Sequence, residues 1–234
     1  MSLILPRGIQ PARSLVTMKQ RVITVVLLVG LGFALVTLAT GMASWRRPDI
    51  EQGYSPEQPI NYSHRLHAGE LQINCQFCHS AAEHSQHAGI PSSDVCMKCH
   101  KIVTSSFEML QQEMKLADQE KRKPKQIVSS ELRKLYDSLG LDETLQPKAG
   151  STPTSLPWVR IHDLPDYVCF DHRAHISAGV TCQRCHGPVE SMQRMRQAES
   201  LSMGWCVNCH RDATHQGING QSVNASTNCT VCHH

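Results

Sequence analysis

Ten of the eleven cysteines lie in five copies of one short pattern, C-x-x-C-H. Two thiols separated by two residues can form thioether bonds to the two vinyl groups of one porphyrin, and the imidazole that follows can ligate the iron. The pattern therefore predicts covalent haem attachment. The cysteines of the five copies are Cys75, Cys78, Cys96, Cys99, Cys182, Cys185, Cys206, Cys209, Cys229 and Cys232. The histidines that complete them are His79, His100, His186, His210 and His233.

Zinc ribbons and disulfide frameworks also use C-x-x-C pairs. A tetrahedral zinc site takes two such pairs, and five pairs cannot be divided into twos. Zinc also gives no reason for a histidine after every second cysteine. Disulfides within a C-x-x-C pair are strained and redox-active, so they make poor structural crosslinks. We therefore predict five covalently bound haem c groups.

The composition agrees with a fold that is organised by its cofactors. Only 5% of the residues are aromatic, and the chain after about Gln52 is poor in Leu, Ile, Val and Phe. Such a sequence can hardly build a sufficient core from its own side chains, so we expect the apoprotein to be largely unfolded. The predicted fold is mainly α-helical and irregular, with little β structure and one N-terminal transmembrane helix. A net charge of +3 gives no indication of nucleic-acid binding. The eleventh cysteine, Cys169, is expected to be a buried free thiol.

An uncharged stretch of 24 residues, 22–45, follows the N-terminal segment 1–21. It is long enough to span a bilayer, whereas the apolar part of a cleaved signal peptide usually has about 7 to 15 residues. Cleavage after the small residues 41–43 is the alternative, and Met18 is an alternative start. We favour an uncleaved signal anchor. Because haem c is attached outside the cytoplasm, residues 1–21 form a cytoplasmic tail and the haem part lies on the periplasmic side of a bacterial cytoplasmic membrane.

The remaining chain divides into a first haem module with two motifs (46–100), a connector (101–157) and a second module with three motifs (158–234). The connector contains neither Cys nor His. Helical spacing after a capping box at Ser105–Glu108 predicts one helix, and a second helix is expected from near Ser130 to Gly140. A basic run at Lys121–Lys125 is either a solvated face or a docking patch for an acidic partner or lipid headgroups.

In each module an H-x-x-H pair precedes the first C-x-x-C-H motif: His64 and His67 in the first module, and His172 and His175 in the second. This arrangement resembles the small multihaem cytochromes of the c3 and c7 type. The resemblance implies that the first histidine of each pair ligates the haem just downstream, bound at Cys75 or Cys182. The second would then ligate a neighbouring haem, most simply the one bound at Cys96 or Cys206.

The haem at Cys229 still needs a second axial ligand, for which Met203, Met192 and His162 are the candidates. Methionine as a ligand would raise the potential of that haem above its bis-histidine neighbours, whereas methionine is also a common gap-filler against a porphyrin face. With a ligand available for each iron, we expect six-coordinate, low-spin haems that pass electrons and bind no substrate.

Five segments are similar to the pentahaem cytochrome c subunit of alternative complex III. They are His64 to Gly69, Ala88 to Ser92, Cys96 to His100, Trp158 to Asp166 and Met203 to Arg211. The resemblance implies a bacterial membrane complex that oxidises quinol, with iron–sulfur and integral membrane subunits as partners. This chain would not be an enzyme by itself and would have no catalytic residues. It would pass electrons to a monohaem cytochrome, a copper protein or a terminal oxidase.

Two other classes of function compete with this reading. A stand-alone membrane quinol dehydrogenase of the NapC/NrfH kind also has one N-terminal helix, but its four haems usually follow the anchor closely, which the Cys-free connector argues against. A multihaem reductase would need an open iron in a pocket with acid–base residues, and no such constellation stands out in the sequence.

Overall fold

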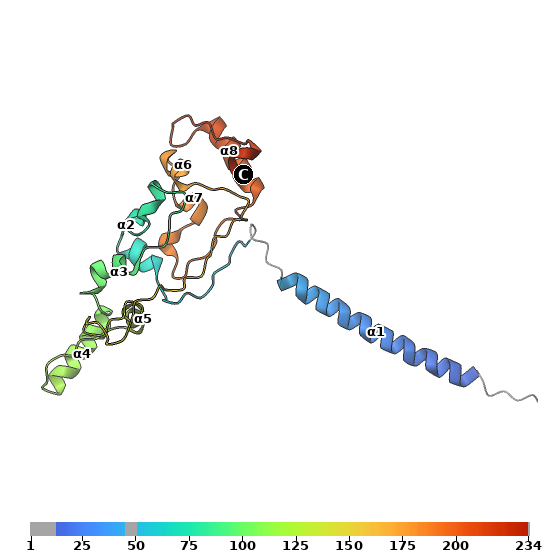
Figure 1. The fold of residues 1–234 in the computed structure, drawn as a ribbon, viewed down its shortest axis with the longest axis horizontal. Helices are drawn as coiled ribbons and strands as arrows, with labels where there is room; N and C mark the ends of the chain where they lie inside the picture. The colour runs from blue at the N-terminus through green and yellow to red at the C-terminus, as the bar shows by residue number, and fades with distance from the viewer. Residues whose placement is uncertain (1–12, 45–50, 234) are drawn as a thin grey trace, which may run out of the picture. The chain divides into compact units, whose positions relative to one another are not determined.

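The computed structural model describes the backbone of residues 13–44 and 51–233, which fall into two compact units, Met1–Arg47 and Pro48–His234. Every regular element in the described residues is a helix, and only two isolated β-bridges occur among them. The predicted fold, mainly helical and irregular with little β structure, is confirmed. Figure 1 shows the order of the helices along the chain.

The first unit is one helix, α1 (Arg13–Ser44). Its segment Thr17–Met42 is long and apolar enough to cross a membrane, and its side chains are exposed. At 1.5 Å per residue, 26 helical residues rise about 39 Å, which exceeds the ~30 Å hydrocarbon core of a bilayer. The predicted N-terminal transmembrane helix is therefore present in length and composition. It begins before the expected Val22, and Trp45 lies outside the described residues.

In the second unit the two haem modules consist of short helices joined by loops. The first module contains η1 (Arg65–Glu70), α2 (Cys75–Cys78), η2 (Ser80–Glu83) and α3 (Ser93–His100). The second contains α6 (His172–Ser177), α7 (Gln183–His186), η3 (Val189–Ser191), α8 (Met203–Gln216) and α9 (Cys229–Cys232). Most of these helices have too few turns to be stable alone, so their positions depend on what they pack against.

The connector forms the two predicted helices, α4 (Phe107–Gln119) and α5 (Ser130–Ser138). Each is capped by the serine before it. For α4 this is Ser106, one residue after the start of the predicted capping box, and its hydroxyl accepts from Met109 N. For α5 the hydroxyl of Ser129 accepts from Leu132 N. Figure 1 shows both helices at one end of this unit, next to α3.

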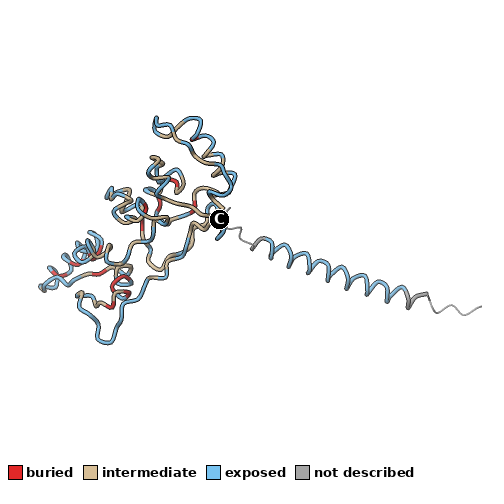
Figure 2. The backbone as a smooth tube through the Cα atoms, turned by 45° about the horizontal axis from the view of Figure 1, so that its top comes forward, coloured by how far each residue is buried: buried red, intermediate tan, exposed pale blue. Residues whose placement is uncertain are grey.

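The contiguous apolar core of the described residues lies in the connector and contains Val128, Leu135 and Tyr136. It reaches the first module, because Cys96 and Met97 of α3 pack against it. The hydroxyl of Tyr136 also donates a hydrogen bond to the carbonyl of His100, at 2.5 Å. In Figure 2 the buried stretches are short and scattered along the tube. This sparse core is what we expect of a chain whose modules are filled by haem.

The apolar residues of helix α4 that follow helical spacing are exposed. Glu113 and Ala117 are buried, whereas Phe107 is 69% and Met114 62% exposed. The carboxylate of Glu113 pairs with the guanidinium of Arg122 at 2.5 Å, and it also accepts from Lys125 N at 2.7 Å. Arg122 and Lys125 of the basic run therefore fix the turn after α4 through Glu113.

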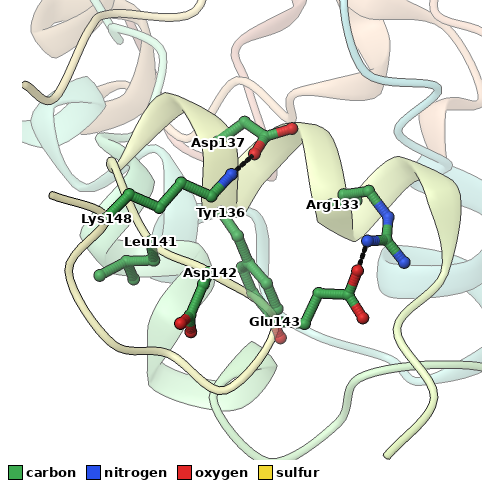
Figure 3. A pocket seen from close by; sticks show the side chains of 7 residues that line it. All are labelled: Arg133, Tyr136, Asp137, Leu141, Asp142, Glu143 and Lys148. Atoms are coloured by element: carbon green, nitrogen blue, oxygen red, sulfur yellow. Dashed lines mark hydrogen bonds and ion pairs between the residues drawn. The ribbon is translucent and has the colours of Figure 1, made fainter. Parts of the chain in front are cut away.

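A cavity of about 280 Å³ lies against α5 (Figure 3). Two ion pairs line it, Arg133 with Glu143 and Lys148 with Asp137. Its other lining residues are Tyr136, Leu141 and Asp142, so no thiol or imidazole faces it. We interpret it as a gap beneath the loop that follows α5, with no chemistry of its own.

The two haem modules are in contact through η1 and η3. The amide of Arg65 donates to the carbonyl of Met192 at 2.9 Å, and the hydroxyl of Ser63 donates to the Gln193 side chain at 2.8 Å. At Gly69 the approach is so close that a Cβ atom would collide with the carbonyl of Glu190. Only glycine fits this position, which explains the small residue after the first H-x-x-H pair.

Candidate haem-binding site

Each C-x-x-C pair is folded into a turn of helix. Residues three apart in a helix project from the same side, so both thiols of a pair point in one direction and the following histidine lies beside them. Asn74 and Asn228 fix two of the shortest helices, since their side chains accept hydrogen bonds from Gln76 N (2.8 Å) and Thr230 N (3.1 Å). All ten motif thiols are free, as thioether formation requires.

The thiols also show which motifs are neighbours. Burial, and then the nearby Cys99 thiol, raises the pKa of Cys78 above its usual range, so the first and second motifs are adjacent. Burial, and then the Cys75 thiol, raises the pKa of Cys182, which is in hydrogen-bonding contact with Cys75. The first motif therefore lies between the second and the third.

The second module continues this row. Burial, and then the thiols of Cys209 and Cys206, raises the pKa of Cys185 to about 11. Burial, and then the Cys232 thiol, raises the pKa of Cys206. Counted along the chain, the motifs thus follow one another in space in the order second, first, third, fourth, fifth. Figure 1 agrees, with α3, α2, α7 and α8 arranged in this order from the connector end.

The motif histidines use Nδ1 for a hydrogen bond, which leaves Nε2 for a metal. In four of the five, Nδ1 pairs with a backbone carbonyl: His79 with Gly89 (2.8 Å), His100 with Val103 (2.8 Å), His210 with Ser226 (2.6 Å) and His233 with Tyr167 (3.2 Å). A carbonyl can only accept, so Nδ1 carries the proton and the lone pair is on Nε2. Nε2 is then ready to bind iron, which is how metal-ligating histidines are normally held.

The two H-x-x-H pairs have the same local structure. In each, the Nδ1 of the second histidine donates to the carbonyl four residues earlier, His67 to Ser63 at 2.9 Å and His175 to Asp171 at 2.8 Å. The first histidines differ. His172 donates through Nδ1 to the Gln86 carbonyl of the first module at 2.9 Å, whereas the buried Nδ1 of His64 has no partner among the described residues.

Three histidines of these pairs each lie opposite a motif histidine, at nearly the same distance between ring centres. The ring centres of His67 and His100 are 6.0 Å apart, those of His172 and His186 6.4 Å, and those of His175 and His210 5.9 Å. Two metal–imidazole bonds of about 2 Å on opposite sides of one ion place the ring centres roughly 6 Å apart. These distances therefore fit one iron between the two rings of each pair.

The fourth predicted pair, His64 with His79, is also close. Burial, and then His79, lowers the pKa of His64 to about 4. Burial lowers the pKa of His186 to about 3, with His162 as the next cause. Both imidazoles are therefore neutral at pH 7, which is the form that binds a metal. Thiols, neutral imidazoles and fixed tautomers together fit covalent haem.

The three candidates for the remaining ligand lie in different surroundings. Met203 begins α8 and is 68% exposed, whereas Met192 is buried and its methyl group lies near Gly187. His162 is next to His186, its Nε2 being 3.3 Å from the Nδ1 of His186. This nitrogen of His162 therefore points at another imidazole.

Sequence reasoning missed two aromatic residues, Tyr62 and Phe170. Tyr62 stacks on His67 with ring centres 4.4 Å apart and meets His64 edge-on at 4.9 Å. Phe170 does the same, stacking on His175 at 4.5 Å and meeting His172 edge-on at 4.8 Å. The signal was present in the sequence, since each aromatic residue stands two positions before its H-x-x-H pair.

Comparison with known proteins gives two similarities. Residues 168–234 match the family described as cytochrome c7 and related cytochrome c. The chain is also 26% identical over 209 residues to the multiheme cytochrome c subunit of a menaquinone reductase from Nitratidesulfovibrio vulgaris (strain Hildenborough), with 81% of this chain and 82% of the relative covered. These similarities support the predicted multihaem cytochrome c and a role in electron transport. Neither of them names alternative complex III.

Proposed function

We propose that this chain is a membrane-anchored pentahaem cytochrome c that relays electrons within a quinone-linked oxidoreductase complex. The observation that carries the proposal is the set of three histidine pairs with ring centres 5.9 to 6.4 Å apart, each beside a C-x-x-C-H motif. Two imidazoles for one iron leave no coordination position for a substrate. This arrangement suits an electron carrier, whereas a reductase would need an open iron.

Haem c, when bound, supplies one-electron chemistry at its iron. The ten motif cysteines hold the porphyrins, and the five motif histidines are the proximal ligands. His64, His172, His67 and His175 are the second ligands of the haems bound at Cys75, Cys182, Cys96 and Cys206, respectively. For the haem at Cys229 the candidates are Met203, Met192 and His162. The proposed haem content is therefore five, one for each motif.

The continuous row of motifs supports a relay. Adjacent motifs have thiols close enough to influence one another's pKa, so no motif is isolated from the others. We place the anchor α1 in the bacterial cytoplasmic membrane and the haem unit on its periplasmic side. The partners are then iron–sulfur and integral membrane subunits on one side of the relay, and a soluble carrier or terminal oxidase on the other.

Two directions of electron flow are compatible with such a subunit. The resemblance to the alternative complex III subunit favours oxidation of quinol and delivery of electrons to a periplasmic acceptor. The similarity to a subunit of a menaquinone reductase favours the reverse direction, with menaquinone as the electron acceptor. We propose quinol oxidation as the first candidate and menaquinone reduction as the second.

The test is to purify the full chain from membranes, once with its co-purifying proteins and once alone. We expect only low-spin haem signals in the electron paramagnetic resonance (EPR) spectrum and five haems by mass. Reduction of the haems by menaquinol should require the co-purifying proteins. Quinol oxidation by the chain alone would contradict the proposal and favour a stand-alone dehydrogenase. Net reduction of menaquinone by the complex with a reduced periplasmic donor would select the second direction.

A further inference from the structure

We propose that His162 is a positioning residue for His186 and ligates no iron. Its Nε2 accepts a hydrogen bond from Nδ1 of His186, which leaves Nε2 of His186 for the haem bound at Cys182 and Cys185. This inference rests on the proposed function in one respect, namely that His186 is the proximal ligand of that haem.

The two ring nitrogens of His186 have different roles: one contacts His162 and the other is left for the iron. Nδ1 lies 3.3 Å from Nε2 of His162, with the two rings nearly perpendicular at 80° and their centres 4.5 Å apart. The ring of His172 lies 6.4 Å from that of His186 and almost parallel to it, at 6°. An iron between His172 and His186 would therefore use the nitrogen of His186 that His162 does not contact.

His186 is the exception among the motif histidines. The other four donate through Nδ1 to a carbonyl of the backbone, which holds one orientation of the imidazole without any side chain. For His186 the side chain of His162 is the hydrogen-bond partner of Nδ1. A substitution at position 162 can therefore change the setting of one haem while the other four proximal ligands keep their partners.

The segment that carries His162 is fixed at several points. The side chain of Gln58 bonds twice to Val159, donating to its carbonyl at 3.0 Å and accepting from its amide at 2.9 Å. Arg160 donates through Nε to the carbonyl of His162 at 3.1 Å and pairs with Asp163 at 2.9 Å. These contacts hold the backbone on both sides of His162 in place.

A second partner of this kind orients a ligating histidine and raises its basicity. Removing it should change the ring orientation and the electron donation of His186 without removing the iron ligand. The expected signature is a change in the low-spin EPR signal and in the reduction potential of one haem. Loss of an axial ligand gives a different signature, a high-spin signal from one haem.

The experiment compares His162→Leu, His162→Gln and the control His215→Leu in the full chain with its haems attached. His215 is exposed on α8 and serves as the matched histidine. We expect five haems by mass in all three variants. In His162→Leu one low-spin signal and one reduction potential should shift, and His162→Gln, which retains a hydrogen-bond acceptor, should recover part of that shift. His215→Leu should match the wild type.

A new high-spin signal in His162→Leu would make His162 an axial ligand and overturn the proposal. Spectra and potentials that match the wild type in both His162 variants would also overturn it. If His162→Leu does not fold, His162→Gln still decides the question, because a glutamine that replaced an iron ligand would leave a high-spin haem. Failure of the proposed relay would appear separately, as high-spin signals in the unmutated chain.

Discussion

The ring of Phe170 stacks on the ring of His175, with centres 4.5 Å apart and planes inclined by 30°. The same relationship joins Tyr62 to His67 at 4.4 Å and 23°. In both modules the aromatic ring therefore packs against the second histidine and limits rotation of its imidazole. The carbonyl four residues earlier accepts a hydrogen bond from Nδ1 of the same histidine. An aromatic–x–H–x–x–H unit, rather than the two histidines alone, is the repeated element.

Phe170→Leu should loosen His175 and His172 together. A stacked or edge-to-face aromatic pair contributes about 0.5–1.5 kcal/mol beyond its buried area, so we expect a loss of about 1 kcal/mol in the free energy of unfolding. The low-spin EPR signals of two haems should broaden. Phe107→Leu, which changes an exposed ring on the connector, is the control. Unchanged EPR signals in Phe170→Leu would remove the ring from the ligand-holding structure.

Gly69→Ala should separate the two modules locally, because the added Cβ atom would meet the carbonyl of Glu190. Overpacking of this kind costs about 1–3 kcal/mol. Denaturant unfolding of the haem-loaded protein, followed by haem absorbance, should show the loss. Gly32→Ala on α1 adds the same methyl group where nothing lies within 4 Å and should leave the unfolding midpoint unchanged.

Acid should weaken the turn after α4. The hydrogen bond from Arg122, and then that from the Lys125 amide, lowers the pKa of Glu113 from 4.5 to about 2. Because this pKa is lower in the folded chain, the stabilisation is complete above about pH 4.5 and is lost as the pH falls towards 2. Hydrogen exchange of α4 amides should therefore be faster in Glu113→Gln than in the wild type at pH 7, and the difference should shrink at pH 3.

Asp118→Asn is the matched control for this measurement, since it removes an exposed carboxylate from the same helix. It should exchange like the wild type at both pH values. A difference between Glu113→Gln and the wild type that does not change with pH would show that the carboxylate charge is not what holds the turn.

Loss of haem should have consequences that depend on position in the row. Replacing Cys182 and Cys185 by serine removes the attachment site of a middle motif, whereas replacing Cys229 and Cys232 removes that of an end motif. Because the haems supply the core that the side chains lack, we expect the first variant to lose most of its helical circular dichroism and the second to keep most of it. Mass measurement of attached haem gives the count. Equal losses in both variants would contradict the row order.

The sequence predicted the parts of this structure that depend on local chemistry. The helices α4 and α5 follow from apolar spacing and serine caps, and the five motifs are fixed by the spacing of Cys and His. The assignment of His67 to His100, His172 to His186 and His175 to His210 rests on a family resemblance, and the three ring distances fit it.

The parts that could not be predicted depend on contacts between residues far apart in the chain. The closeness of Cys75 to Cys182 arises from packing between the two modules. The contact of His162 with His186 arises from packing within the second module, and no spacing rule exists for either contact. The exposure of Phe107 and Met114 on α4 could not be predicted either. Apolar spacing indicates an apolar helix face but does not show whether another part of the chain covers it.

The order of the motifs in space also has a consequence for biogenesis. With the haem unit exported as proposed, the second motif, at the end of the row, crosses the membrane before the third, which lies in the middle. The first motif, at Cys75, therefore lacks its neighbour, the third motif, until the connector and the start of the second module have followed. Until then the first module lacks the packing of η1 against η3 and the contact of Cys75 with Cys182.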